Sequence, residues 1–136
     1  VSESTIKSWI TALEATGIIA LLPPYFENLG KRIIKAPKLF FRDNGLLAHF
    51  LNITDYPTLE RSGYLGHLWE NFVFTEFIKG GLKEGRDLYF FRDSNGVEID
   101  FIIHTGNTIH MVEAKYSELP DPKKQHFSKL AYLFKQ

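Results

Sequence analysis

The sequence predicts a mixed α/β (α+β) chain, because segments with helical periodicity alternate with short segments of strand periodicity. In the first half, a helical pattern over 5–16 precedes two apolar segments, 18–22 and 33–41, that are typical of an antiparallel hairpin. In the second half, a helical pattern over 64–79 precedes three strand-like segments and a last helix from Lys123 onward. We therefore expect the order helix, three strands, helix after the first hairpin.

The first helix has apolar residues at helical spacing, with Ser4 as a suitable N-cap and Gly17 after its end. Its apolar residues are Ile6, Trp9, Ile10 and Leu13. Pro23 ends the following strand, and the segment 25–32 is turn-rich. A helix followed by a two-stranded hairpin is the latter part of a winged helix-turn-helix. Residues 1–58 are thus predicted to be a partial winged helix whose earlier helices lie upstream.

The second predicted domain is 59–136. Asp43 is expected to cap a short helix that runs through Leu51, and 52–62 is interpreted as a linker that contains the boundary. The long helix over 64–79 is ended by two glycines.

The strands over 97–104 and 108–116 are predicted to form a hairpin. Gly106 stands first in a two-residue loop, which suits a type II′ turn with Thr105 opposite Thr108. A one-residue slip or a bulge would change this register.

In this register Asp100 lies opposite Glu113, and Glu98 opposite Lys115, with all four side chains on one face. Two opposed carboxylates repel each other, whereas a divalent cation such as Mg²⁺ or Mn²⁺ would be held by their oxygens. Lys115 is then placed to bind a phosphate or to orient a water. The alternative is a solvated hairpin face with a surface pair between Glu98 and Lys115.

A third acid is expected from the long helix. Glu70 lies beside its apolar stripe, where a carboxylate can reach the sheet edge and complete a metal shell. Glu76, within the stripe, is the competing candidate, and a capping or surface role is the alternative for Glu70.

A basic segment is the candidate nucleic-acid contact, because it carries four cations and no acid. These cations are Lys31, Arg32, Lys35 and Lys38. On the wing of a winged helix they could contact phosphates, and a solvated hairpin is the alternative.

The composition narrows the function classes. Sixteen basic and sixteen acidic residues give the chain a formal net charge of zero. The absence of cysteine excludes disulfides and thiolate metal sites. The five histidines show no close ligand spacing, and no phosphate-binding loop of the G-x-x-x-x-G-K-[ST] type is present. No apolar segment is long enough to cross a membrane, and no signal peptide opens the chain, so we expect a cytoplasmic protein. The chain begins at Val1 and ends within a helical pattern, and we expect it to be part of a longer protein.

The pattern Asp100 followed by Glu113-Ala114-Lys115 resembles the D…E-x-K signature of the PD-(D/E)xK nuclease superfamily. The order of elements resembles its restriction-endonuclease-like αβββα core, which usually ends with a further strand, so we expect the domain over 59–136 to be truncated at its C-terminus. The resemblance implies that Glu70, Asp100 and Glu113 bind the metal and that Lys115 is catalytic.

The whole chain also resembles the C-terminal domain of unknown function that follows a predicted AAA-type ATPase module in many bacterial and archaeal proteins. The matching segments are Ser4-Thr5-Ile6, Leu13-Glu14, 37–46, 66–73, Phe91-Arg92-Asp93, 98–101 and 112–115. This resemblance implies an upstream ATPase domain, where ATP would bind.

Three function hypotheses follow. The first is Mg²⁺-dependent hydrolysis of DNA phosphodiesters, with Glu98 holding Lys115 and the Ala114 carbonyl as a further ligand. The second is a DNA- or protein-binding regulatory module of the ATPase that performs no chemistry. The third is a protein-interaction domain without a nucleic-acid role.

Overall fold

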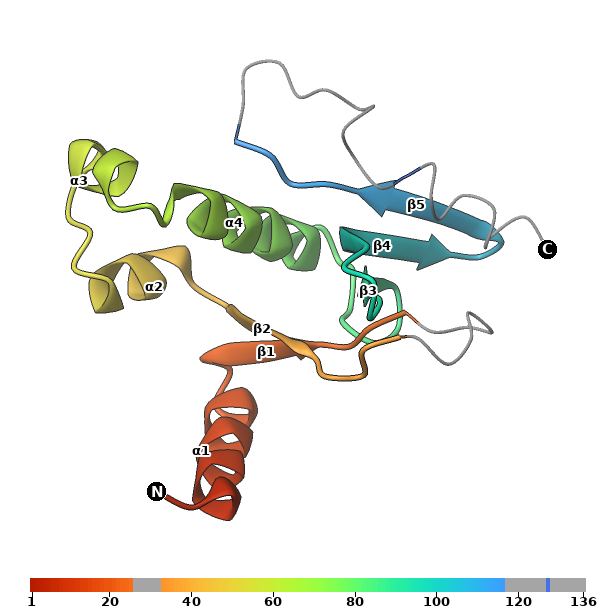
Figure 1. The fold of residues 1–136 in the computed structure, drawn as a ribbon, viewed down its shortest axis with the longest axis horizontal. Helices are drawn as coiled ribbons and strands as arrows, with labels where there is room; N and C mark the ends of the chain where they lie inside the picture. Colours follow the sequence, from red (N-terminus) through yellow and green to blue (C-terminus); the bar gives the residue numbers. More distant parts are fainter. Residues whose placement is uncertain (26–32, 117–126, 128–136) are drawn as a thin grey trace.

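The computed structural model describes residues 1–25, 33–116 and 127 of the chain, and it shows a mixed α+β architecture, as predicted (Figure 1). The described elements are α1 (Glu3–Ala15), β1 (Ile19–Leu22), β2 (Lys38–Phe41), α2 (Asn44–Phe50), α3 (Tyr56–Arg61), α4 (Leu65–Lys79), β3 (Leu88–Arg92), β4 (Glu98–Thr105) and β5 (Thr108–Val112). Strands β1 and β2 form an antiparallel hairpin, and β3, β4 and β5 form a separate antiparallel sheet with β4 in the middle. The last helix predicted from Lys123 lies outside the described residues, apart from Phe127.

Helix α1 begins two residues earlier than predicted. Its N-cap is Ser2, whose hydroxyl accepts a hydrogen bond from the Thr5 N–H at 3.2 Å. The helix extends away from the β1–β2 hairpin (Figure 1), and none of its residues is buried. Its predicted apolar stripe is present but exposed to solvent. Ile6, Trp9 and Leu13 are 46%, 58% and 39% exposed.

The β1–β2 hairpin is joined to the three-stranded sheet by backbone hydrogen bonds. Strand β2 is shorter than the predicted strand over 33–41, and Ile33 instead forms an isolated bridge with Asp93. After β1, the Tyr25 N–H donates to the Phe90 carbonyl at 2.7 Å. The hairpin is therefore held beside β3, which brings β2 close to the second half of the chain. The rest of the predicted turn-rich segment lies outside the described residues.

The prediction of a linker over 52–62 was wrong, because helix α3 lies within it. Asp55 caps this helix by accepting a hydrogen bond from the Thr58 N–H at 2.7 Å. Pro57 is tolerated in the first turn, where the N–H groups have no partner within the helix. The signals taken for a loop are thus the signals that begin a short helix. Asp43 caps α2 in the predicted way, accepting from the Leu46 N–H at 2.6 Å.

A buried asparagine attaches the end of β2 to helix α4. Asn71 is 4% exposed, and its amide accepts from the Phe41 N–H at 2.8 Å and donates to the Phe41 carbonyl at 3.0 Å. The same amide donates to the Asn44 side chain at 2.9 Å. One side chain on α4 therefore satisfies both backbone groups of the last β2 residue.

We expect Asn71→Ala to lower the free energy of unfolding by about 1–3 kcal/mol, because it leaves the N–H and carbonyl of Phe41 without these partners. Urea unfolding followed by circular dichroism measures the change. Asn95→Ala, in an exposed turn, is the control and should leave the midpoint unchanged. Equal midpoints for both variants would contradict this role of Asn71.

One hydrophobic cluster joins the two halves of the chain. Its buried members are Ala20, Leu22, Phe40, Phe74, Leu88, Phe90 and Phe101. They come from β1, β2, α4, β3 and β4, and the Phe40 and Phe74 rings stack with centroids 4.4 Å apart. The hairpin of the predicted first domain therefore packs directly on elements of the predicted second domain.

The β4–β5 hairpin has the predicted register. Thr105 pairs with Thr108, and the pairing continues to Phe101 opposite Val112. Gly106 has a φ of 59°, and Asn107 is not among the positive-φ residues, which is the pattern of the predicted type II′ turn.

A bulge interrupts β4 at Asp100 and Phe101. Phe91 pairs with Ile99 and Tyr89 pairs with Ile102, so β4 has one residue more than β3 in this interval. Simple alternation would put Ile99 and Ile102 on opposite faces of the sheet. Instead, Ile99 and Ile102 pack together in a second cluster, while Phe101 packs in the cluster that includes α4.

No helix in the described part of the chain is both long and apolar enough to cross a membrane.

Candidate functional site

The carboxyl groups of Asp100 and Glu113 lie in contact at the end of the β4–β5 hairpin, as the predicted register requires. Strand β5 ends at Val112, one residue before Glu113 and earlier than predicted. The segment that follows stays close to β4, because the Ala114 N–H donates to Asp100 Oδ2 at 2.9 Å. A side-chain hydrogen bond joins Glu113 to Asp100. The hairpin thus places two acids side by side, with a backbone N–H on one of them.

The Glu113 carboxyl is protonated more readily than a free glutamate. Burial, together with the hydrogen bond and the charge of Asp100, raises the pKa of Glu113 from its ordinary value of 4.5 to about 8. Lys115 opposes this change, with its Nζ 3.7 Å from Glu113 Oε2. Near neutral pH Glu113 therefore keeps its proton and does not carry its negative charge.

This shift predicts a falling stability with rising pH. Below pH 4.5 both the folded and the unfolded chain keep the Glu113 proton, so the contribution of this group to the free energy of unfolding is fully present. Between 4.5 and about 8 only the folded chain keeps it, and above about 8 the contribution is lost. Glu113→Gln, which imitates the protonated form, should flatten this part of the profile in urea unfolding at several pH values.

Glu76→Gln is the control for this experiment, because the Glu76 side chain is 47% exposed and pairs with Lys79 on the surface. It should keep the wild-type slope. An unchanged slope in Glu113→Gln would show that the proton is not held at this carboxyl.

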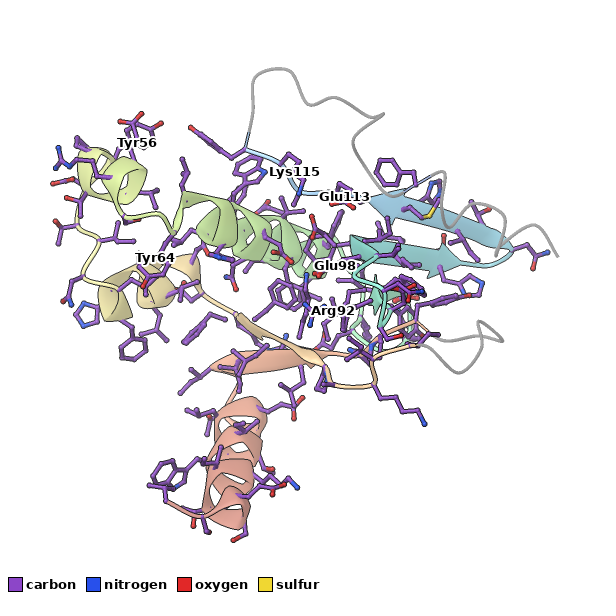
Figure 2. The ribbon with its side chains drawn as sticks, viewed as in Figure 1. Tyr56, Tyr64, Arg92, Glu98, Glu113 and Lys115 are labelled. Atoms are coloured by element: carbon purple, nitrogen blue, oxygen red, sulfur yellow. The ribbon has the colours of Figure 1, made fainter. Side chains whose placement is uncertain are left out.

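Lys115 and Glu98, predicted to face each other, both lie close enough to Glu113 for their charges to act on its carboxyl group (Figure 2). The Lys115 side chain is 49% exposed. The Glu98 carboxylate accepts from two guanidinium nitrogens of Arg92, at 3.0 and 3.2 Å, and lies 2.7 Å from Lys38 Nζ. Burial raises the pKa of Glu98, but Arg92 and Lys38 lower it more, so that it stays below its ordinary value. Arg92 was not predicted as part of the site.

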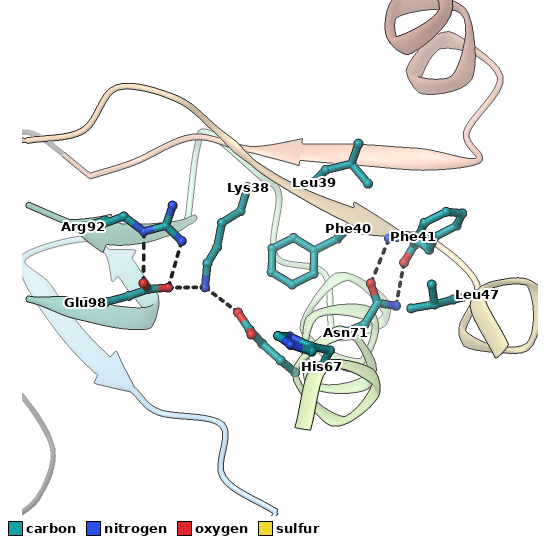
Figure 3. A pocket seen from close by; sticks show the side chains of 10 residues that line it. Lys38, Leu39, Phe40, Phe41, Leu47, His67, Asn71, Arg92 and Glu98 are labelled. Carbon is teal, nitrogen blue, oxygen red and sulfur yellow. Dashed lines mark hydrogen bonds and ion pairs between the residues drawn. The ribbon is translucent and has the colours of Figure 1, made fainter. Parts of the chain in front are cut away.

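Lys38, predicted as a nucleic-acid contact, has its ammonium group among carboxylates instead. Its Nζ lies 2.5 Å from Glu70 Oε1 (Figure 3) and 3.7 Å from Asp100 Oδ1, and its side chain is 13% exposed. One signal in the sequence indicated an inward direction. Strand alternation puts Lys38 on the same face as Phe40, which is 4% exposed.

Of the two candidates for a third acid, the structure brings Glu70 to the site. The Glu70 side chain is 19% exposed and pairs with Lys38, whereas Glu76 points to the surface pair with Lys79. Across the part of the chain that the structure describes, no three His, Asp or Glu side chains converge closely enough to hold a metal ion as they stand.

Two pockets flank Glu70. One has a volume of about 400 Å³ and is lined by Glu70, Asp100, Ala114 and Lys115, among others. The other, of about 430 Å³, is lined by Glu70, Lys38, Arg92 and Glu98 (Figure 3). The first pocket therefore gathers three of the predicted site residues and the backbone of the segment that carries Glu113.

Of the other three predicted nucleic-acid contacts, the structure describes only Lys35. Lys35 is exposed, as a phosphate contact requires. Lys31 and Arg32 lie outside the described residues.

The fold and the site define a mixed α+β domain with a group of acids between a helix and the end of an antiparallel hairpin. Residues 65–135 match the model of a domain of unknown function, DUF4143, and residues 1–56 match the model of a second domain of unknown function, DUF8612. The first match covers more than half of the chain, so the chain belongs to the DUF4143 family.

Relatives are found in two mycobacteria. The chain is 32% identical over 133 residues to an uncharacterized protein of Mycobacterium bovis and, at the same identity and length, to one of Mycobacterium tuberculosis. Each match covers 98% of this chain but only 30% of the relative. No solved structure matches the chain.

Proposed function

We propose that the chain carries a divalent-metal-dependent phosphodiesterase site of the PD-(D/E)xK type, which acts on DNA within a longer protein that also has an AAA-type ATPase module. The observation that carries this proposal is the contact between the Asp100 and Glu113 carboxyl groups, with Lys115 beside them. In this reading the first half is the latter part of a winged helix and the second half is a restriction-endonuclease-like core.

The donor set suits Mg²⁺ or Mn²⁺. Two carboxyl groups in contact are unfavourable when both are charged, and a hard divalent cation with oxygen ligands removes that repulsion. Asp100 and Glu113 would hold the ion, with the Ala114 carbonyl as a further ligand and Glu70 facing the same pocket. When bound, the ion would supply Lewis acidity and lower the pKa of its water ligand.

The groups that line the pocket would bind and orient the substrate and the metal ligands. The Lys115 side chain is half-exposed, so its ammonium would be accessible to a phosphate oxygen or to an attacking water. The Ala114 N–H on Asp100 Oδ2 keeps that carboxylate in one orientation. The pocket of about 400 Å³ that these groups line has room for a phosphate and part of a sugar.

The proposal is tested by titrating the full chain with Mn²⁺ in a calorimeter and by incubating it with DNA in Mg²⁺ or Mn²⁺. We expect one bound ion per chain and DNA cleavage that a chelator stops. A folded protein that neither binds Mn²⁺ nor cleaves DNA would refute the proposal.

The second candidate is a DNA- or protein-binding module without chemistry. The position of Lys38 favours it, because an ammonium already lies among the acids and neutralises part of their charge. DNA affinity that falls steeply with salt, without cleavage in either metal, would support this candidate. Lys35→Ala should then weaken DNA binding.

A further inference from the structure

The Lys38 ammonium is surrounded by acids from two other elements. Its Nζ lies 2.5 Å from Glu70 Oε1 on α4 and 2.7 Å from Glu98 Oε1 on β4 (Figure 3), and it lies 3.7 Å from Asp100 Oδ1, also on β4. Lys38 itself comes from β2, which is distant in sequence from all three acids. The hydrophobic contact between Phe40 and Phe74 fixes this strand against α4, so the ammonium is held in place by the core.

These acids need a cation at this position. Carboxylates that are mostly buried lose much of their hydration, and they remain charged only where a positive group compensates them. Arg92 makes two hydrogen bonds to Glu98, and Lys115 lies beside Glu113. Burial lowers the pKa of Lys38, but Glu70 and Glu98 raise it more, so its amine stays charged.

We propose that Lys38 is the internal counter-cation of the site, and that its ammonium occupies a cation position which a divalent ion would otherwise take. Glu70 and Glu98 are thereby held by the protein itself, and a metal ion is confined to the side of Asp100 and Glu113. Lys38 is thus a positioning residue that limits the site to a single divalent ion. This inference rests on the proposed function.

The test is the number of Mn²⁺ ions bound per chain, measured by electron paramagnetic resonance of free Mn²⁺ during titration. The variant is Lys38→Met, which removes the charge and keeps an unbranched stem against the Phe90 ring, whose centroid is 5.5 Å from the ammonium. We expect the count to rise from one ion in the wild type to two in Lys38→Met. A merely structural role for Lys38 would lower stability without adding a metal.

Two controls separate charge from substitution as such. Lys38→Arg keeps the positive charge and should bind one ion. Lys79→Met removes a lysine of α4 whose side chain is 69% exposed, and it should also bind one ion. Two ions in either control would overturn the inference, as would a folded Lys38→Met that binds no more ions than the wild type.

The same titration separates this inference from the proposed function. If the wild type binds one ion and Lys38→Met also binds one, the inference fails and the metal site stands. If the wild type binds none and Lys38→Met binds one, Lys38 excludes the metal as inferred, and the metal-dependent function of the wild type fails. No binding by either folded protein refutes both.

If Lys38→Met does not fold, the inference is tested by a measurement on the wild type. An ammonium held by carboxylates exchanges its protons slowly, so the Lys38 side-chain NH₃⁺ signal should be visible by ¹⁵N NMR. With saturating Mg²⁺ the signal should persist, because the metal binds beside it. Its loss on adding Mg²⁺ would show that the metal displaces Lys38, and would overturn the inference.

Discussion

Asp100→Asn is expected to abolish metal-dependent DNA cleavage, with a loss of Mn²⁺ affinity of at least about a hundredfold. Asparagine has the shape of aspartate, and its amide oxygen can accept the hydrogen bond from the Ala114 N–H that Asp100 Oδ2 accepts at 2.9 Å. The variant therefore keeps the fold and removes one charge from the contact with Glu113. The cleavage rate and the Mn²⁺ titration measure the loss, and circular dichroism checks the fold.

The matched control is Asp55→Asn, which makes the same chemical change at the N-cap of α3. Asparagine caps a helix as well as aspartate does, so cleavage and metal affinity should stay at the wild-type level. Cleavage that survives in purified Asp100→Asn would exclude Asp100 as a metal ligand.

Phe74→Ala is expected to cause the largest loss of stability, about 3–5 kcal/mol in the free energy of unfolding. The Phe74 side chain is fully buried, and its ring stacks on Phe40 of β2 within the cluster that also contains Phe90 and Phe101. Its removal leaves a cavity where the hairpin meets the sheet. Urea unfolding followed by fluorescence and by circular dichroism measures the change.

Phe72→Ala is the control on the same helix, because Phe72 is 39% exposed and packs on Trp69 at the surface. Phe72→Ala should lower the free energy of unfolding clearly less than Phe74→Ala does. The shared cluster also predicts that both probes report one transition, since the hairpin and the sheet lose the same contacts. Similar losses for the two variants would contradict the assignment of Phe74 to the common core.

The β4–β5 hairpin could be predicted closely because its geometry is local. The two-residue loop that begins with Gly106 sets the register, and the register sets which side chains face each other. Asp100 and Glu113 follow from this geometry alone. The caps of α2 and α3 are equally local, although the signals at Asp55 and Pro57 were interpreted as a linker.

The partners of Lys38 could not be predicted because they come from distant elements. Alternation along β2 places its side chain on the inner face with Phe40, but Glu70 and Glu98 reach it from α4 and β4. Only tertiary packing brings these three elements together. The open apolar face of α1 is a related case, since periodicity predicts the helix but not whether its stripe is covered.

The extra residue in β4 has a consequence for comparing this chain with its relatives. On one side of the insertion, even-numbered residues such as Glu98 and Asp100 share a direction, and on the other side Ile102 points the opposite way with Ile99. An alignment that counts regular two-residue steps through the whole strand will equate inward positions with outward ones. The acid at 100 should therefore be aligned together with Glu98, from the β3 side of the insertion, and not by counting back from the turn at Gly106.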